Sequence, residues 1–223
     1  MNIVPYADRE ILAMDVADSL ASELRMALSQ NDVVTLAVAG GTTPGPIFDV
    51  LCDIDIDWDR VRVLPTDERW VPETDPRSNA RLIKERLLVG RASAATYLPL
   101  YTTGEEPETA LPALAAQIEP LLPLNLVVLG MGADMHTASL FPGTPGLDAA
   151  LSVDAPVLAV LRPQSQPETR VSLTARVLKG AIQTHLVITG ADKRAALDLA
   201  RDLPIEAAPV RAILTESTIH WAE

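Results

Sequence analysis

Asp134 and His136 stand two positions apart in a turn that follows an apolar run, and together they could move a proton. The run, Leu126–Leu129, is typical of a strand that is buried on both faces of a parallel sheet. Gly130 and Gly132 follow it, where the backbone can turn sharply or pass close to a ligand. Open α/β sheets bind ligands at the carboxyl ends of their strands, and histidine suits proton transfer near neutral pH. The spacing therefore predicts an active-site turn in which His136 could move a proton.

Three other interpretations of this turn have less support. A dinucleotide site would need a third glycine and an acidic ribose partner, which the GMGADM stretch lacks. Ser139 and Thr137 beside His136 suggest a serine hydrolase, but no G-x-S-x-G elbow accompanies them. Metal catalysis would need a second histidine or a cysteine near Asp134 and His136. We therefore expect neither a metal nor a cofactor.

A second group of candidate residues, Gly40, Gly41, Thr42 and Thr43, follows another predicted strand. Free backbone N–H groups and hydroxyls at a helix N-terminus can bind phosphate. The stretch lacks the GK[ST] ending of a Walker A loop. An ordinary strand-to-helix turn fits the same residues, with Thr43 as the N-cap and Pro44 in the first helical turn.

Two basic residues, Arg170 and Lys193, could supply positive charge to such a site. Lys193 falls in the first turn of a predicted helix, where an exposed cation costs about 0.3–1 kcal/mol because it opposes the helix dipole. An anion beside Lys193 would explain its position. Arg170 precedes the VSLT run and can bind phosphate with two parallel hydrogen bonds. Each residue could instead be a solvated surface charge.

Asp67 and Arg69 follow a predicted strand at 61–64 and should lie at the same edge of the sheet. Asp67 could accept a hydrogen bond from a sugar hydroxyl, and Arg69 could stabilise negative charge on a substrate or a transition state. The alternative is a surface ion pair between Glu68 and Arg69, worth about 0–1 kcal/mol.

The elements that must position these residues alternate between strand and helix patterns. Strands are predicted at 33–39, 61–64, 98–101, 126–129, 157–161, 186–189 and 210–214, with a polar loop at 66–78. Helices are predicted at 8–29, 44–51, 78–88, 110–121, 175–180 and 191–200. This alternation predicts an α/β fold with a doubly wound, mostly parallel sheet and helices on both faces. Residues 1–223 should form a single α/β domain, with prolines setting off a small lobe around 90–124.

Composition restricts the partners and the compartment. The formal net charge of −12 argues against nucleic acid and anionic membranes as partners, and any phosphate site must be locally positive. The single cysteine, Cys52, suits a reducing cytosol, and the N-terminus resembles no signal peptide. No apolar run approaches the roughly 18 residues of a membrane helix. We expect a cytoplasmic protein that is a monomer or a weak homodimer.

Five motifs together resemble the 6-phosphogluconolactonase family. They occur in that family's order and at fitting intervals: AVAGGTTP (37–44), TDERWVPETDPRSN (66–79), GMGADMHTASLFPG (130–143), RVSLT (170–174) and TGADK (189–193). The resemblance implies the fold that these enzymes share with glucosamine-6-phosphate deaminases and ribose-5-phosphate isomerases. One departure stands out, because the family usually has Asp-Gly-His where this chain has Asp134-Met135-His136. If that position needs a positive φ, Met135 is strained.

The resemblance also implies a reaction, the hydrolysis of 6-phospho-D-glucono-1,5-lactone to 6-phosphogluconate in the oxidative pentose phosphate pathway. By this resemblance His136 activates water, and Asp134 orients His136 or holds a ring hydroxyl. Arg69, or backbone N–H groups near Gly132, would stabilise the developing oxyanion. The substrate is a phosphosugar lactone, and no cofactor is implied.

The phosphate-binding roles come from the same resemblance. In the family the arginine and the lysine of the last two motifs contact the phosphate, which assigns that role to Arg170 and Lys193. The backbone at Gly41, Thr42 and Thr43 lies near the phosphosugar pocket of the family.

Two alternatives remain at this point. A glucosamine-6-phosphate deaminase shares the fold, but its sequence runs toward Asn-Glu-Pro after Asp-x-His, where this chain has TASLFPG. A non-catalytic sugar-phosphate sensor domain also uses the fold in some transcriptional regulators. That option needs a DNA-binding helix-turn-helix, for which the chain has neither a basic N-terminal module nor room.

Overall fold

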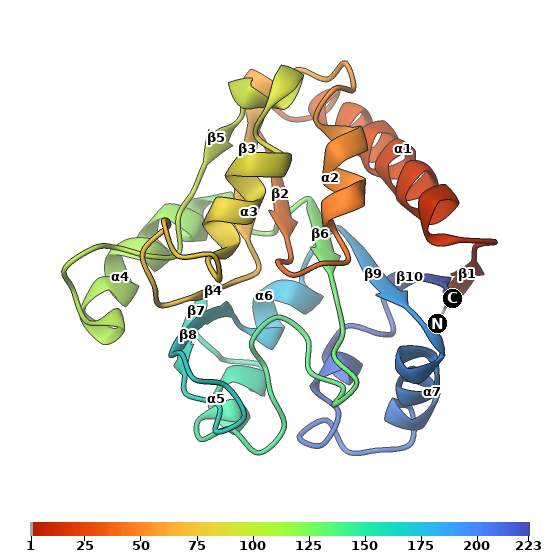
Figure 1. Cartoon of the computed structure of the whole chain (residues 1–223). Coiled ribbons are helices and arrows are strands. Elements are labelled where there is room, and N and C mark those ends of the chain that lie inside the picture. The colour runs from red at the N-terminus through yellow and green to blue at the C-terminus, as the bar shows by residue number, and fades with distance from the viewer. Residues whose placement is uncertain (1) are drawn as a thin grey trace.

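The central sheet is parallel throughout, and its carboxyl edge carries the candidate residues. The computed structural model describes residues 2–223, within which seven strands pair in the order β1-β10-β9-β6-β2-β3-β5 (Figure 1). Every pairing in this sheet is parallel. The strands are β1 (Asn2–Pro5), β2 (Val34–Val38), β3 (Val61–Pro65), β5 (Thr96–Tyr97), β6 (Leu126–Leu129), β9 (Gln183–Thr189) and β10 (Ser217–Ala222).

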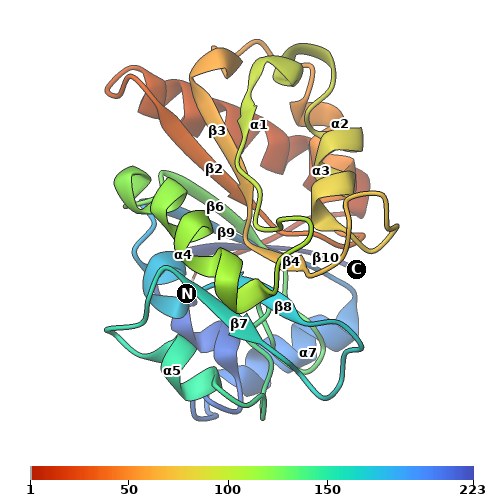
Figure 2. The same ribbon diagram turned by 90° about the vertical axis from the view of Figure 1, so that its left-hand side faces the viewer.

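A second, antiparallel sheet of three strands lies beyond the end of β3. It consists of β4 (Asp67–Arg69), β8 (Arg170–Leu173) and β7 (Leu158–Leu161), and Figure 2 shows β7 and β8 side by side below β4. Two expectations are wrong here, since 67–69 was expected to be loop and 157–161 to join the parallel sheet. The three residues of β4 form a strand because they pair with β8, which lies a hundred positions later in the chain.

Helices cover both faces of the central sheet, as the alternating pattern predicts. One face packs against α1 (Arg9–Leu28), α2 (Gly45–Leu51) and α3 (Asn79–Arg86). The other packs against α4 (Pro107–Ile118), α6 (Ala175–Lys179) and α7 (Ala191–Ala200), and the short α5 (Leu147–Leu151) belongs to the same core. Figure 1 shows α1 to α3 above the sheet edge and α5 to α7 below it.

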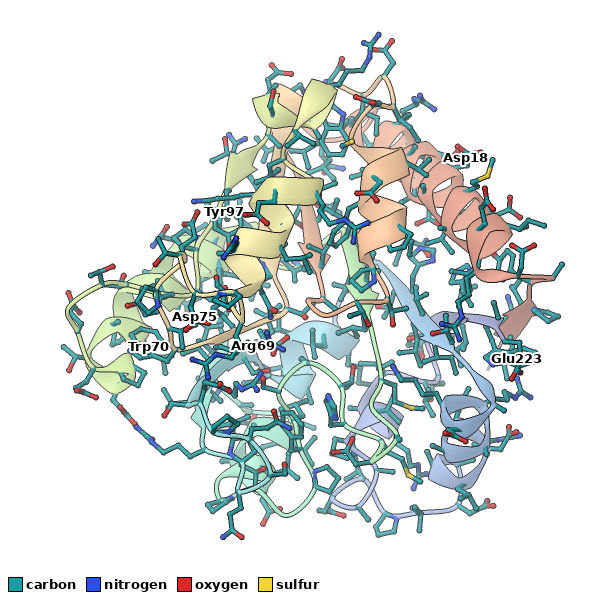
Figure 3. All side chains as sticks on the ribbon, viewed as in Figure 1. Asp18, Arg69, Trp70, Asp75, Tyr97 and Glu223 are labelled. Carbon is teal, nitrogen blue, oxygen red and sulfur yellow. The ribbon has the colours of Figure 1, made fainter. Side chains whose placement is uncertain are left out.

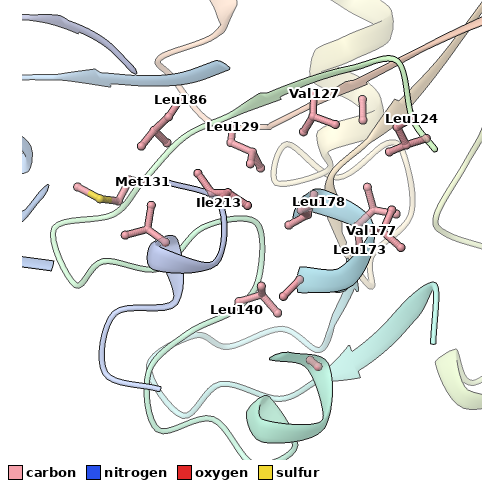
Figure 4. Packing of buried hydrophobic residues seen from close by; sticks show 14 of the residues in the cluster. Leu124, Val127, Leu129, Met131, Leu140, Leu173, Val177, Leu178, Leu186 and Ile213 are labelled. Carbon is pink, nitrogen blue, oxygen red and sulfur yellow. The ribbon is translucent and has the colours of Figure 1, made fainter. Parts of the chain in front are cut away.

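The strand β6 contributes side chains to the hydrophobic cores on both faces of the central sheet. Successive side chains of a strand point to opposite faces. Leu126 and Val128 therefore join the core under α1 and α2, whereas Val127 and Leu129 join the core on the opposite face. Figure 4 shows the latter pair packed with Leu178 and other apolar side chains. The continuous apolar run is thus explained by burial on both faces.

The C-terminal part differs most from expectation. The predicted strand at 210–214 is wrong, because Pro209–Ala212 forms a 3₁₀ turn and the last strand is β10. Val210 is buried, and its N–H donates to the carbonyl oxygen of Met135 instead of to a strand. The predicted strand at 98–101 lies earlier in the structure, as β5.

Within residues 2–223, no helix combines the length and the hydropathy that crossing a bilayer requires.

Candidate active site

A cleft of about 280 Å³ opens at the carboxyl edge of the central sheet and gathers the candidate residues. All the predicted site residues except Asp134 line it: Gly40, Gly41, Thr42, Thr43, Asp67, Arg69, Gly132, His136, Arg170 and Lys193. They come from segments that are far apart in the chain, after the ends of β2, β6 and β9 and within β4 and β8. Figure 3 shows Arg69 in the middle of the molecule, between α3 above and α5 below.

The turn after β6 holds His136 against Asp134. The imidazole Nδ1 lies 2.5 Å from the carboxylate Oδ1 of Asp134, which is therefore a partner of His136 although it does not line the cleft. Gly132 makes room for this pair, because a Cβ there would lie 2.3 Å from the imidazole and 2.4 Å from Asp134 Oδ1. The N–H of Gly132 donates to the carbonyl oxygen of His136. That amide is thus not available to stabilise an oxyanion.

The same turn forces two residues other than glycine into the left-handed region. Met135 has φ of 66° and Ala138 has φ of 47°. The position that resembles Asp-Gly-His therefore does require a positive φ, which costs a residue with a side chain about 1–2 kcal/mol. Strain of this kind is concentrated at functional sites.

The surroundings of His136 favour an ionised Asp134 and a fixed imidazole. Burial raises the pKa of the Asp134 carboxyl, but the hydrogen bond and the charge of His136 together lower it by more, so that the pKa lies below its usual range. Phe141 stacks on the imidazole of His136, with 4.0 Å between the two ring centroids. The guanidinium of Arg170 lies 5.9 Å from the centroid of the Phe141 ring. The sequence analysis did not predict a role for Phe141, although its position in the same 130–143 turn as His136 could have indicated one.

Arg69 and Arg170 are directly opposite each other on β4 and β8. Arg170 is 4% exposed, and burial together with the charge of Arg69 lowers the pKa of its guanidinium. Within residues 2–223, neither buried Nε has a hydrogen-bond partner. Like charges that face each other across an antiparallel pair are destabilising, and buried donors without acceptors add to the cost. Both costs fall when an anion binds between the two side chains.

Asp67 is buried and points one oxygen at the turn that carries His136. Its Oδ2 accepts a hydrogen bond of 2.6 Å from Ser139, whose own N–H donates to the hydroxyl of Ser172. Ser139 is fully buried, and its hydroxyl is bound to the carboxylate of Asp67. It is therefore not placed to act as a nucleophile activated by His136. The contact instead ties the turn at 130–143 to β4 and β8.

Glu68 has a structural role that the sequence did not indicate. It is fully buried. Its carboxylate accepts hydrogen bonds from the backbone N–H of Arg69 in β4 and from those of Asn79 and Ala80 at the start of α3. Burial raises the pKa of Glu68, although these N–H groups oppose the shift. The expected alternative of a surface ion pair between Glu68 and Arg69 is therefore wrong.

Glycines in the turn after β2 are required by close contacts and by conformation. A Cβ on Gly40 would lie 1.8 Å from Oδ1 of Asn79, and Gly41 has φ of +88°. The amide of Asn79 donates to the carbonyl oxygen of Asp67, so that this turn and β4 lie together at the cleft. The predicted cap is wrong, since α2 begins at Gly45 with Pro44 as an N-cap that makes no side-chain bond.

Lys193 lies in the first turn of α7, as predicted, and lines the cleft. Burial lowers the pKa of its ammonium group, and the charge of Arg9 lowers it further. An anion in the cleft would compensate both effects. Among residues 2–223, no cluster of three or more histidine, cysteine, aspartate or glutamate side chains is arranged to hold a metal ion.

Comparisons with known proteins show the family to which the chain belongs. The sequence model of the family described as Glucosamine-6-phosphate isomerases/6-phosphogluconolactonase matches residues 7–221. The chain belongs to this family. A relative from Caulobacter vibrioides, named 6-phosphogluconolactonase, is 39% identical and the match covers 98% of this chain and 96% of the relative. Another with that name, from Mesorhizobium japonicum, is 40% identical and the match covers 97% and 93%.

Solved structures of the family have the same architecture. The crystal structure of a 6-phosphogluconolactonase from Shewanella baltica superposes with a TM-score of 0.96 at 30% identity, covering 100% of this chain and 98% of that one. The expected resemblance and the expected α/β fold are therefore confirmed.

Proposed function

We propose that this protein hydrolyses 6-phospho-D-glucono-1,5-lactone to 6-phosphogluconate, a step of the oxidative pentose phosphate pathway. One observation carries the proposal. The imidazole of His136, with its Nδ1 on Asp134, lines the same cleft as the cations of Arg69, Arg170 and Lys193. A base and a local excess of positive charge are what the hydrolysis of a phosphorylated lactone needs. Relatives named 6-phosphogluconolactonase support the choice of substrate.

The chemistry begins with the imidazole. The carboxylate of Asp134 accepts a hydrogen bond from Nδ1–H, which leaves Nε2 as the basic nitrogen. Nε2 takes a proton from water as the water oxygen bonds to C1 of the lactone. The bond between C1 and the ring oxygen then breaks, and the imidazolium returns its proton to that oxygen, which becomes a hydroxyl. General-base catalysis of this kind contributes about 10²–10⁴-fold in rate.

The cations bind the phosphate and so fix the distance from C1 to His136. Arg170 and Lys193 serve this purpose, together with the backbone at Gly41, Thr42 and Thr43, which lines the same cleft. Since Arg69 is opposite Arg170 on the neighbouring strand, its charge serves the substrate phosphate. Asp67 accepts a hydrogen bond from a sugar hydroxyl.

The remaining parts of the proposal concern the setting. The enzyme acts in the cytoplasm as a single α/β domain, a monomer or a weak homodimer, without a cofactor, a nucleic acid or a membrane. The net charge of −12 and the single cysteine support these assignments.

A direct assay tests the function. Freshly prepared lactone is added to the protein, and acid release is followed against the spontaneous rate. Acid release well above that rate is expected. Turnover no faster than the spontaneous rate, or ammonia release from glucosamine 6-phosphate, would contradict the proposal.

A further inference from the structure

Two arginines of the cleft are held close together in spite of their repulsion. Arg69 and Arg170 are paired residue to residue across β4 and β8, and each has a buried Nε without a partner among residues 2–223. Their guanidinium groups cannot adopt this arrangement without a compensating negative charge nearby. Asp67, Glu168 and Glu68 all supply negative charge near Arg170, and of these three Glu168, two residues before Arg170, forms an ion pair with it.

Each oxygen of Glu168 serves a different arginine. Oε2 lies 3.3 Å from Nη2 of Arg170, and Oε1 accepts a hydrogen bond from Nη1 of Arg77. The carbonyl oxygen of Arg77 in turn accepts a hydrogen bond from Nη1 of Arg69. A chain of contacts therefore runs from Arg69 through Arg77 and Glu168 to Arg170.

The burial of Glu168 distinguishes this contact from an ordinary surface pair. Its side chain is 8% exposed, and that of Arg170 is 5% exposed. A buried carboxylate with both oxygens bound resists rearrangement, because separating it from its partners leaves a charge without a partner. Gln166 adds a further restraint, since its Oε1 accepts a hydrogen bond of 2.9 Å from Nη2 of Arg170.

We propose that Glu168 is a positioning residue that holds Arg69 and Arg170 as a pair to receive one phosphate dianion of the substrate. The inference rests on the proposed function, because it assumes that the anion is the substrate's phosphate. Glu168 holds Nη2 of Arg170, whose Nε is buried and has no hydrogen-bond partner among residues 2–223. A preorganised pair loses less entropy when it binds phosphate than two independent side chains do.

A repulsive role of Glu168 and a positioning role predict opposite changes in phosphate affinity, so one substitution can distinguish them. A carboxylate near the phosphate repels it, so a purely electrostatic role predicts that neutralising Glu168 strengthens phosphate binding. A positioning role predicts that it weakens binding. The substitution Glu168→Gln preserves shape and removes the charge, and therefore decides between them.

The experiment measures the Kd for inorganic phosphate by titration calorimetry, in wild type and in Glu168→Gln. We expect the Kd to rise about tenfold, equivalent to about 1.4 kcal/mol, since hydrogen bonds to charged groups contribute that much. Glu108→Gln is the matched control, because Glu108 pairs with Arg162 on an exposed surface and the substitution changes the net charge equally. Its Kd should equal that of wild type. An unchanged or lower Kd in Glu168→Gln would overturn the proposal.

Kinetics with two substrates exclude a general structural effect. With the phosphorylated lactone, Glu168→Gln should raise KM and leave kcat nearly unchanged. With glucono-1,5-lactone, which has no phosphate, kcat/KM should not differ from that of wild type. Equal losses on both lactones would overturn the proposal.

The calorimetric result stays informative if the proposed function fails. A protein that turns over neither lactone but loses phosphate affinity on Glu168→Gln keeps the positioning role and refutes the lactonase activity. Normal lactone hydrolysis with an unchanged Kd refutes only the positioning role.

Discussion

The ring of Phe141 lies against the imidazole of His136, with 4.0 Å between centroids and an angle of 23° between planes. The guanidinium of Arg170 is 5.9 Å from the centroid of the same ring. Phe141 is 4% exposed and therefore has little freedom to move. One aromatic side chain thus fixes the distance between the proposed base and a proposed phosphate-binding residue.

Replacing Phe141 with leucine should lower kcat about two- to tenfold, because the stack and its attraction for the imidazolium that forms during catalysis are worth about 0.5–1.5 kcal/mol. Phe48→Leu is a suitable control, since Phe48 is a fully buried residue of α2 and belongs to the other core. It should lower the free energy of unfolding without lowering kcat. A wild-type kcat in Phe141→Leu would contradict a role of the Phe141 ring in catalysis.

Gly132→Ala should lower kcat about 10²-fold, because the new Cβ would displace the imidazole of His136 and the carboxylate of Asp134, and a shift of about 1 Å has effects of that size. The far-ultraviolet circular dichroism spectrum should not change. The affinity for inorganic phosphate should also persist, since Arg170 and Lys193 are not displaced. Unchanged kcat would show that the turn adapts without loss.

Met135→Gly should leave both kcat and the free energy of unfolding close to wild type. Relief of the positive φ stabilises by about 1–2 kcal/mol. The greater flexibility of glycine in the unfolded chain, about 0.5–1 kcal/mol, and the lost packing of the Met135 side chain offset this gain. Chemical denaturation and steady-state kinetics measure the two quantities. A large loss of activity would mean that the Met135 side chain itself, which packs against the core, positions His136.

The other two histidines form a buried chain of hydrogen bonds away from the cleft. His220 Nδ1 lies 2.8 Å from the hydroxyl of Tyr6, His220 Nε2 lies 3.0 Å from His185 Nδ1, and His185 Nε2 lies 2.7 Å from Glu23. If Tyr6 donates to His220, every later contact has one donor and one acceptor with both imidazoles neutral. These hydrogen bonds join the residue after β1 to β10, β9 and α1, which gives the two histidines a structural role.

His220 should make the protein less stable as the pH falls from about 6.5 to about 4. Burial, and next the charge of His185, lower the pKa of His220 to about 4, whereas an unfolded histidine takes up a proton near pH 6.5. The unfolded state therefore binds more protons in that window, and the loss amounts to at most about 3 kcal/mol. Urea denaturation of wild type and His220→Asn between pH 4 and pH 7.5 measures it. Equal pH slopes for the two proteins would contradict the assignment.

Features that depend on neighbouring residues could be predicted from the sequence, whereas features that depend on long-range strand pairing could not. The turn at 130–143 is predictable, because glycines, a carboxylate and an imidazole follow one apolar strand without interruption. The strand β4 is not predictable, because only its pairing with distant β8 makes a strand of three charged residues. For the same reason the sequence could not reveal the burial of Glu68 against the start of α3, or the register of Arg69 against Arg170.

Apolar content alone also misled the prediction near the C-terminus. Val210 and Ile213 are fully or almost fully buried, but Pro209 begins a 3₁₀ turn there. The strand β10 contains His220, whose polar ring is paired inside the core, so its pattern is not that of an apolar strand.

The role of His136 is tested most directly by measuring kcat for the phosphorylated lactone and Kd for inorganic phosphate in His136→Gln. The account predicts that kcat falls about 10²–10⁴-fold, because the base is lost, while Kd stays at the wild-type value, because the cations remain. A variant that keeps wild-type kcat would contradict the account.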